Sequence, residues 1–220
     1  MLDGFTLVEL LVVISIIAIL AGLLLPAVRV VKEKSLGLKC ASNIRQLGFG
    51  IAAYAEDNEG ILPNTYNSLG SPVYRWTELI ATYVEASKKD NGTLSTSLQL
   101  TNSVLAGCPS YKPTTGLTAW DVGYGLNGQM NWPTNGNNSD TRNIATGTYK
   151  VFSLASVSFP SNRCLLVDCP SFSAQSLALN MAGGIRHQNR LTTLFVDLHV
   201  QPLLIEDYLL TVTNPAAYSP

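Results

Sequence analysis

The sequence predicts an α+β protein. A long N-terminal helix, membrane-spanning in its first half, packs through its second half on a C-terminal head made of an antiparallel β-sheet with long loops. Three observations support this prediction. Apolar residues fill positions 5 to 31 almost without interruption, and they then recur at helical spacing as far as Tyr54. The two segments that read most clearly as strands come late in the chain, after Asn162.

The composition favours an exported protein. Its 220 residues suit one domain with an appendage. Charged residues make up 13% of the chain, which is low for a cytosolic protein, and the part after the apolar block is rich in Asn, Ser, Thr and Gly. The formal net charge of −1 creates no basic field, so a nucleic-acid partner is not predicted.

The apolar block has the length of a membrane helix. Residues 5–28 read FTLVELLVVISIIAILAGLLLPAV, and the only charged residue among them is Glu9. Crossing a bilayer core as a helix takes about 20 residues. A secretory signal peptide has a shorter apolar core after a basic segment, whereas residues 1–4 contain no Lys or Arg. A buried helix of a soluble protein would need protein on every side.

Glu9 is the informative residue of this block. A carboxylate at the edge of a membrane span is costly and normally has a partner. One interpretation places Glu9 at the interface, among the lipid headgroups. The other pairs it with a positive group on a neighbouring subunit, and a free α-amine on Phe5, exposed by a cut after Gly4, would supply that group.

The run GFTLVE, from Gly4 to Glu9, leads directly into the apolar segment, which later contains Pro26. This combination resembles the class III signal of type IV pilins and type II secretion pseudopilins. The resemblance implies that a prepilin peptidase cuts after Gly4 and that the new N-terminal residue, Phe5, is methylated. It also implies that Glu9 neutralises the N-terminus of the neighbouring subunit during assembly. Pro26 matches the family's mid-helix proline, where a lost backbone hydrogen bond lets helices kink or melt.

The leader departs from the family pattern in its charge. Family leaders carry Lys or Arg before the Gly, whereas this chain has Asp3. The first basic residues follow the span, at Arg29, Lys32, Lys34 and Lys39. The positive-inside rule alone would therefore keep the C-terminal part in the cytoplasm. The motif, the cysteines and the low charge favour export instead, and a translation start upstream of Met1 would supply the missing basic residues.

Beyond the apolar block the predicted helix becomes amphipathic. Apolar residues recur at steps of three and four along one face, at Leu36, Cys40, Ile44, Leu47, Ile51 and Tyr54. The run DNEG at residues 57–60, followed by Pro63, ends the helix. We therefore divide the chain into four parts, which are a leader (1–4), a transmembrane or filament-core helix (5–31), the amphipathic half of the same helix (32–60) and a globular α+β head (61–220).

Further runs resemble a narrower family. CASNIRQL, which begins at Cys40, and CPS, which begins at Cys108, are similar to stretches of the pilin-like proteins abundant in planctomycete and verrucomicrobial bacteria. That family has a C-x-N-L-R-Q-L-G stretch and a later H-x9-DG signature. His187 and Asp197 have the spacing of the signature, but Leu198 replaces its Gly. The resemblance is strong as far as residue 63 and loose beyond it.

The head is predicted to combine one short helix, two strands and long loops. Residues 74–84 (YRWTELIATYV) form the helix. Residues 163–167 and 191–200 (LTTLFVDLHV) form strands that pair antiparallel and pack on the second half of the long helix. Residues 87–103 and 131–148 are rich in turn-forming residues and are predicted to be loops. The tail, residues 208–212, is expected to add an edge strand.

Four residues of the head suggest chemistry, namely Asp168, His187, Asp197 and His199. Asp197 and His199 are two apart on a predicted strand, so they share a face with the spacing of two metal ligands. His187 precedes Asp197 by ten residues and would approach it only across a turn. A hairpin whose polar side chains bond to loop backbone has the same pattern. We adopt that interpretation and predict no metal.

Enzymatic activity is not predicted, because the sequence contains no P-loop, GxGxxG run or nucleophile elbow. Calcium is the one cofactor left open. Some pseudopilin heads bind it in a C-terminal loop, and Asp57, Asn58 and Glu59 offer oxygen atoms, although without EF-hand spacing.

The four cysteines allow two disulfides in an exported protein. Cys40 lies on the apolar helix face, so it is either a buried thiol or one half of a bridge to Cys108 that ties the helix to the head. Cys164 and Cys169 are five apart and would close a tight loop if their Cα atoms came within about 7 Å. No CxxC pair is present, so a zinc ribbon or thioredoxin-like site is not predicted.

These features predict a structural subunit of a type IV pilus-like or type II secretion pseudopilus filament. Its partners would be prepilin peptidase, the inner membrane, further copies of itself and other pilin-like subunits. Before assembly it would cross the inner membrane once with its head in the periplasm, and afterwards it would lie in a periplasmic or extracellular filament. The alternatives are a minor pseudopilin and a monomeric membrane-anchored extracellular binding domain, and only the latter needs neither Gly4 nor Glu9.

Overall fold

The structure is a computed structural model of the 220-residue chain, and it divides into two compact units, Met1–Leu36 and Gly37–Pro220. It describes residues 6–63, 66–67, 74–84, 104–111, 123–127, 140–144, 147–151, 153–169, 186–187, 190–213 and 216. The predicted α+β class is confirmed, since a long apolar N-terminal helix is followed by a four-stranded antiparallel sheet.

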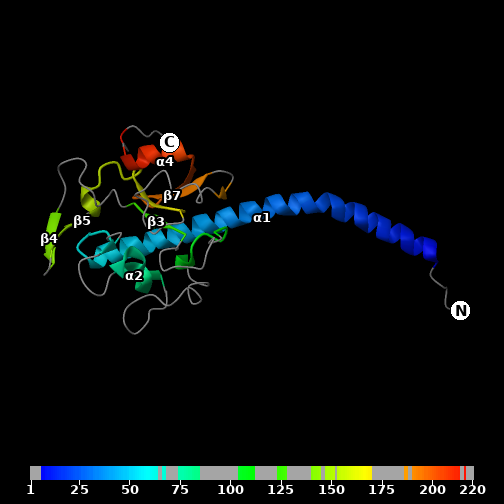
Figure 1. Ribbon diagram of the computed structural model, residues 1–220, viewed down its shortest axis with the longest axis horizontal. Helices are drawn as coiled ribbons and strands as arrows, with labels where there is room; N and C mark the ends of the chain where they lie inside the picture. Colours follow the sequence, from blue (N-terminus) through cyan, green and yellow to red (C-terminus); the bar gives the residue numbers. More distant parts are fainter. Residues whose placement is uncertain are drawn as a thin grey trace. The chain divides into compact units, whose positions relative to one another are not determined.

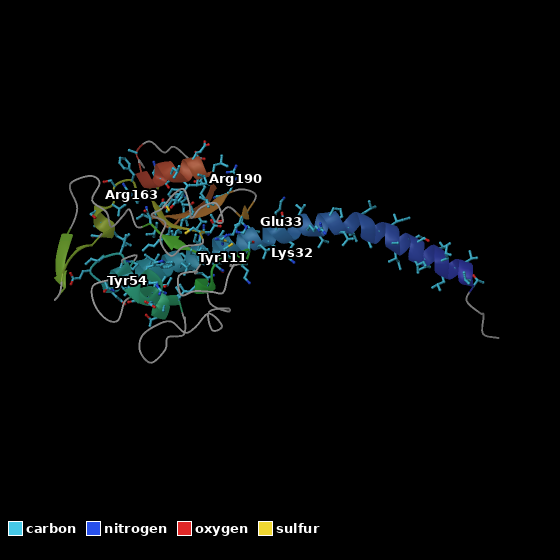
Figure 2. The ribbon with its side chains drawn as sticks, in the orientation of Figure 1. Lys32, Glu33, Tyr54, Tyr111, Arg163 and Arg190 are labelled. Atoms are coloured by element: carbon cyan, nitrogen blue, oxygen red, sulfur yellow. The ribbon has the colours of Figure 1, made fainter. Side chains whose placement is uncertain are left out.

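Helix α1 (Leu7–Asp57) confirms the long N-terminal helix. In the first unit its large apolar side chains from Leu7 to Val31 are 47–77% exposed. Lys32 and Glu33 lie just beyond this segment (Figure 2). Among the described residues this is the one helix that is long and apolar enough to cross a membrane. So much exposed apolar surface requires lipid or other protein around it.

Helix α1 ends where the sequence predicts. The amide of Gly60 donates to the carbonyl oxygen of Ala55 at 2.7 Å, and the side-chain amide of Asn58 donates to the carbonyl oxygen of Tyr54 at the same distance. Glu59 and Gly60 have φ angles of 57° and 78°, in the left-handed region that closes helices. The bonds satisfy carbonyl groups that the helix itself leaves without donors.

The main sheet of the head has the order β3-β6-β7-β8, with every neighbouring pair antiparallel. Its strands are β3 (Gly125–Leu126), β6 (Cys164–Val167), β7 (Leu191–Phe195) and β8 (Val200–Leu203). The predicted strand at 163–167 and its antiparallel pairing with the strand after it are confirmed. The single strand predicted over 191–200 is wrong, because this segment contains β7, a turn and the first residue of β8.

The turn between β7 and β8 explains this correction. Leu198 has a φ of 69°, and its amide donates to the carbonyl oxygen of Phe195 at 3.0 Å. The side chain of Asp197 accepts a hydrogen bond from the amide of His199 at 3.2 Å. Local side-chain bonding of this kind favours a turn over continued strand. Pro202 lies within β8, where an edge strand tolerates its missing N–H.

The tail is a helix rather than the predicted edge strand. Helix α4 (Ile205–Thr213) begins with Glu206 and Asp207, whose charges suit a helix N-terminus. Tyr208 is fully buried against the sheet, and Leu209 packs beside it. The apolar residues of this segment are spaced to cover one face of a helix, so packing against the sheet decides its structure.

The head also contains several smaller elements. Helix α2 (Trp76–Ile80) and the 3-10 helix η1 (Ala81–Val84) confirm the helix predicted at 74–84, although Tyr74–Arg75 form strand β2 and pair with β1 (Tyr66–Asn67). The loop predicted at 131–148 is wrong in its later part, where β4 (Asp140–Ile144) and β5 (Gly147–Val151) form a hairpin. Two 3-10 turns, η2 (Val104–Ala106) and η4 (Leu154–Ser156), complete the described elements. The loop predicted at 87–103 lies outside the described residues.

Both faces of the main sheet are covered, by α1 on one side and α4 on the other (Figure 1). Leu194 faces the α1 side, where it packs with Ile44, Leu47 and Ile51. Its neighbour Phe195 faces the other side and packs with Tyr208. This alternation follows the two-residue period of a strand and confirms that the second half of the long helix packs on the sheet.

Gly48 allows α1 to approach the sheet. A Cβ atom at this position would lie 2.7 Å from Leu194 Cδ2 and 3.3 Å from Leu198 Cδ2. We therefore expect Gly48→Val to destabilise the head by about 1–3 kcal/mol through overpacking. Adding Leu194→Ala should make room, so the double variant should be less destabilised than the sum of the two single variants. Denaturant unfolding of the full chain in detergent tests this, and strictly additive free energies would contradict it.

Candidate functional site

The first turn of α1 is closed by a reciprocal pair of hydrogen bonds. The Glu9 carboxylate accepts from the backbone amide of Thr6 at 2.9 Å and from its hydroxyl at 2.7 Å. In return, the Thr6 hydroxyl accepts from the amide of Glu9 at 3.3 Å. This arrangement is a capping box, in which residues three apart satisfy amide groups that a helix leaves unpaired. Glu9 therefore has a structural partner within its own chain, which sequence reasoning missed.

Of the other processing and assembly residues, only Pro26 lies in the part of the chain that the structure describes. Gly4 and Phe5 lie outside the described residues, so their predicted roles remain predictions. Pro26 lies within α1, and the helix continues through it. A proline cannot donate to the carbonyl group four residues earlier, which here belongs to Gly22, and a Cβ at Gly22 would meet no atom within 4 Å. Proline and glycine thus weaken the same turn of the helix.

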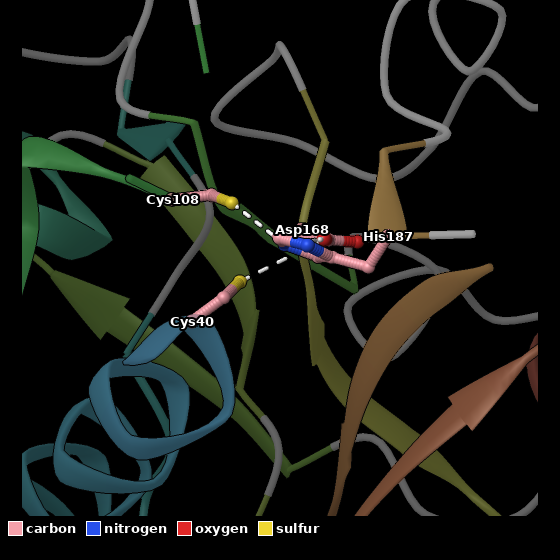
Figure 3. A group of neighbouring side chains, drawn as sticks. All are labelled: Cys40, Cys108, Asp168 and His187. Carbon is pink, nitrogen blue, oxygen red and sulfur yellow. Dashed lines mark hydrogen bonds and ion pairs between the residues drawn. The ribbon is translucent and has the colours of Figure 1, made fainter. Parts of the chain in front are cut away.

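A second group of side chains meets inside the head. Cys40, Cys108, Asp168 and His187 each direct one metal-ligating atom to a common point, and these atoms all lie within 4.8 Å of one another (Figure 3). The first three residues are buried, and the His187 side chain is 13% exposed. Sequence reasoning noted each of these residues but did not bring the four together, because they are far apart in the chain.

Each member of this cluster comes from a different part of the chain. Cys40 lies on the buried face of α1, and Cys108 follows η2. Asp168 comes directly after β6, and His187 precedes β7. Gly37 of α1 lies next to the His187 imidazole, since a Cβ added there would be 3.4 Å from its Nδ1. The packing of α1 against the sheet therefore assembles the cluster.

Besides contacting each other, the two thiols have different partners in the cluster. Cys108 Sγ lies 3.0 Å from His187 Nε2, and Cys40 Sγ lies 3.7 Å from Asp168 Oδ2. His187 Nε2 is also 3.7 Å from Asp168 Oδ2. The other carboxylate oxygen, Asp168 Oδ1, accepts the amide of Thr192 at 2.9 Å, which fixes the orientation of the carboxyl group.

The charges and hydrogen bonds around the cluster favour the thiolate form of Cys108. Hydrogen bonds from Cys40 and His187, together with the Ser110 amide and the Arg186 charge, lower the pKa of Cys108 to about 4. The bond to Cys108 raises the pKa of His187, so each group of this pair favours the charged form of the other. The hydrogen bond that Cys40 donates to Cys108, along with burial and the Asp168 charge, raises the pKa of the Cys40 thiol.

Asp168 behaves as a buried acid. Desolvation raises its pKa to about 8, against the lowering effect of the charges of Arg186 and His187. The cluster thus holds four groups that can lose protons to a cation, in a part of the head from which water is largely excluded. Such a set can bind a metal ion or undergo thiol chemistry.

The comparison with protein families identifies the N-terminal segment. The prokaryotic N-terminal methylation motif matches residues 3–25. This chain carries that methylation motif. No curated protein matches the chain, and no solved structure matches it.

The methylation motif supports a pilin-like or pseudopilin-like protein that prepilin peptidase processes. It covers Gly4, Phe5 and Glu9 and extends to Leu25, one residue before Pro26. It therefore coincides with the start of the exposed apolar part of α1, which fits a membrane anchor. The motif does not reach the head, so the cluster has to be interpreted from its own geometry.

The three weak metal candidates predicted from the sequence lie in two separate places in the head. Asp197 and His199 bond to each other at 2.6 Å in the exposed turn after β7, where the His199 ring stacks on Phe195. His187 belongs to the cluster of Cys40 and Cys108 instead. The shared face predicted for Asp197 and His199 rested on a continuous strand, which the turn interrupts.

The remaining predicted site residues are the four cysteines and the residues at the C-terminal end of α1 that offer oxygen atoms. All four cysteines are free thiols in the structure, and Cys164 and Cys169 are buried on the α4 side of the sheet. The two predicted disulfides stay predictions. At the end of α1, the carboxylate of Asp57 accepts from the Tyr83 hydroxyl at 2.8 Å, and the Asn58 side chain closes the helix as described above.

Proposed function

We propose that this chain is a structural subunit of a type IV pilus-like or type II secretion pseudopilus filament. Prepilin peptidase cuts it after Gly4, the new N-terminus at Phe5 is methylated, and the protein assembles through α1. The role is structural rather than enzymatic. Before assembly the chain crosses the inner membrane once with its head in the periplasm, and afterwards its apolar helix lies among those of neighbouring subunits.

One observation carries this proposal, namely the methylation motif at residues 3–25 on a helix whose large apolar side chains from Leu7 to Val31 are exposed. A membrane anchor alone explains the apolar surface but requires neither the motif nor an acidic residue at its start. Lipid before assembly and neighbouring helices after it would cover the same surface, because both are apolar. Glu9 then lies where a neighbour's α-amine would be its natural partner.

We further propose that the chain is related to the pilin-like proteins with the H-x9-DG signature. Leu198, which stands in place of the signature's Gly, has a φ of 69°. A glycine adopts this backbone conformation without strain. The turn geometry therefore supports the relationship despite the substitution.

Expression of the full chain together with a prepilin peptidase tests the proposed processing. We expect the mature protein to begin at N-methylated Phe5, since the bond after Gly4 is the cut that the motif implies. Intact-mass and N-terminal peptide mass spectrometry would detect both changes. Gly4→Leu should leave the chain uncut, whereas Ser15→Ala, a change within the same helix, should be cut normally.

A chain that keeps its leader in the presence of an active peptidase would contradict both the filament subunit and the minor pseudopilin. It would leave a monomeric anchored binding domain as the function. A chain that is cut but found only as a cap on filaments built from other subunits would indicate a minor pseudopilin. Immunogold labelling of purified filaments distinguishes these outcomes.

A further inference from the structure

We propose that Cys40, Cys108, Asp168 and His187 form a zinc site that fastens α1 to the head. The proposal rests on the described part of the head and is independent of the filament function. It assigns a common role to residues that the sequence suggested for different ones. Cys40 and Cys108 were candidates for a disulfide, whereas His187 was a weak metal candidate.

The geometry is close to that of a tetrahedral zinc centre. Zinc lies about 2.3 Å from sulfur and about 2.0 Å from nitrogen and oxygen, so neighbouring ligand atoms are roughly 3.3–3.8 Å apart. Here Cys40 Sγ and His187 Nε2 are each 3.7 Å from Asp168 Oδ2, and Cys108 Sγ is 3.0 Å from His187 Nε2. The remaining pairs lie within 4.8 Å, so small rotamer changes would complete the tetrahedron.

The donor atoms favour zinc over calcium or magnesium. Two sulfurs, one imidazole nitrogen and one carboxylate oxygen match the ligands that Zn²⁺ uses, whereas calcium and magnesium prefer oxygen alone. Four protein ligands fill a tetrahedral shell and leave no position for substrate. Such a closed site is structural rather than catalytic.

The surroundings provide the outer contacts that a metal centre requires. The Thr192 amide holds Asp168 Oδ1 and turns Oδ2 towards the cluster, while the Tyr124 hydroxyl donates to Cys40 Sγ at 3.7 Å. Partners of this kind orient the ligands of metal sites. Two thiolates and one carboxylate around Zn²⁺ leave a net charge of −1, which a nearby cation would balance.

Arg186 supplies that cation. Its charge acts on both Cys108 and Asp168, and its guanidinium lies over the Tyr111 ring, 4.7 Å from the centroid. Among the described residues, no hydrogen-bond acceptor meets any of its three guanidinium nitrogens. A buried charge without a hydrogen-bond partner is costly. A negatively charged metal centre next to it would reduce this cost.

A Cys40–Cys108 disulfide is the competing interpretation. The structure favours the metal, because both cysteines are free thiols and each sulfur also contacts a ligating group outside the pair, Cys108 Sγ with His187 Nε2 at 3.0 Å and Cys40 Sγ with Asp168 Oδ2 at 3.7 Å. A disulfide would also leave the buried Asp168 carboxyl and the imidazole without a common ligand. The two outcomes exclude each other, so a single preparation can distinguish them.

The test uses the full chain, purified in detergent without chelators after export to the periplasm. Elemental analysis should find about one zinc per chain. After exchange to Co²⁺, the visible spectrum should show tetrahedral ligand-field bands and intense sulfur-to-cobalt charge-transfer bands from two thiolates. The cobalt measurement needs no substitution, so it does not depend on how well any variant folds.

Variants then assign the ligands. Loss of an outer-shell partner typically lowers metal affinity by roughly 10–100-fold, and removal of a ligand should lower it further. We therefore expect Cys108→Ser and His187→Gln to retain far less zinc than the unaltered chain, and Cys108→Ser to halve the charge-transfer intensity in cobalt. Cys164→Ser is the matched control, because Cys164 is equally buried but packs on the α4 side of the sheet, and it should keep the metal.

Three results would overturn the zinc site. The first is a metal-free chain that takes up neither Zn²⁺ nor Co²⁺ at micromolar free metal. The second is a Cys40–Cys108 bridge in the exported protein, detected by peptide mapping after alkylation without reductant. The third is equal loss of metal in Cys108→Ser and Cys164→Ser.

Discussion

Glu9→Gln should prevent the chain from assembling into filaments while leaving its membrane insertion and its fold intact. Glutamine keeps an oxygen that can accept the Thr6 amide, so the capping box of α1 survives. The change removes only the negative charge that we propose to meet the α-amine of a neighbouring Phe5. Loss of one partner of a buried charge pair costs about 2–5 kcal/mol, which corresponds to roughly a 30-fold or greater loss of affinity at each contact.

Filaments sheared from cells and quantified by immunoblotting measure this effect. Glu33→Gln is the matched control, because it makes the same chemical change in the same helix beyond the apolar segment, and it should assemble normally. Thr6→Val separates the two roles of Glu9, since it removes the hydroxyl of the capping box and keeps the charge. If the Gln variant assembled as well as the unaltered chain, the charge pairing would be excluded, and Glu9 would be left with the capping role.

Trp76→Ala is expected to destabilise the head by about 3–5 kcal/mol. Trp76 opens helix α2, is fully buried, and belongs to the core that α1 shares with the sheet. Removing the indole would leave a cavity among Ile51, Ile80 and other residues of that core, and a folded domain has only about 5–15 kcal/mol of stability to lose. Denaturant unfolding of the full chain in detergent, followed by circular dichroism, would measure the change.

Phe49→Ala is the control for this prediction. Phe49 is also aromatic and lies on the head half of α1, but it is 57% exposed. Its removal should change the free energy of unfolding by no more than about 0.5 kcal/mol. Similar losses in the two variants would show that burial at Trp76 does not govern stability.

Elements with a strong local pattern were predictable from the sequence. The apolar block and the spacing from Cys40 to Tyr54 predict α1, because one face of a helix must be apolar wherever it packs. The β7–β8 hairpin was not predictable from composition, since LTTLFVDLHV has no Gly or Pro at its turn. Leu198 takes a left-handed φ that side chains seldom adopt.

The candidate site was even harder to predict from the sequence than the β7–β8 hairpin. Sequence spacing relates residues that are a few positions apart, and it therefore paired Asp197 with His199. The cluster joins Cys40 to Asp168 across 128 positions and Cys108 to His187 across 79. The packing of α1 on the sheet creates these contacts, and no local pattern encodes them. The predicted link between Cys40 and Cys108 came closest, because it used the apolar face on which Cys40 lies.

The continuity of α1 has a mechanical consequence. The helix that carries the exposed apolar segment also supplies Ile44, Leu47 and Ile51 to the interior of the head, where each is at most 1% exposed. A pulling force applied through the N-terminal segment is therefore transmitted directly into the core rather than to a flexible linker. Separating the helix from the head would require uncovering these side chains, so under load the head should resist until it unfolds as a unit.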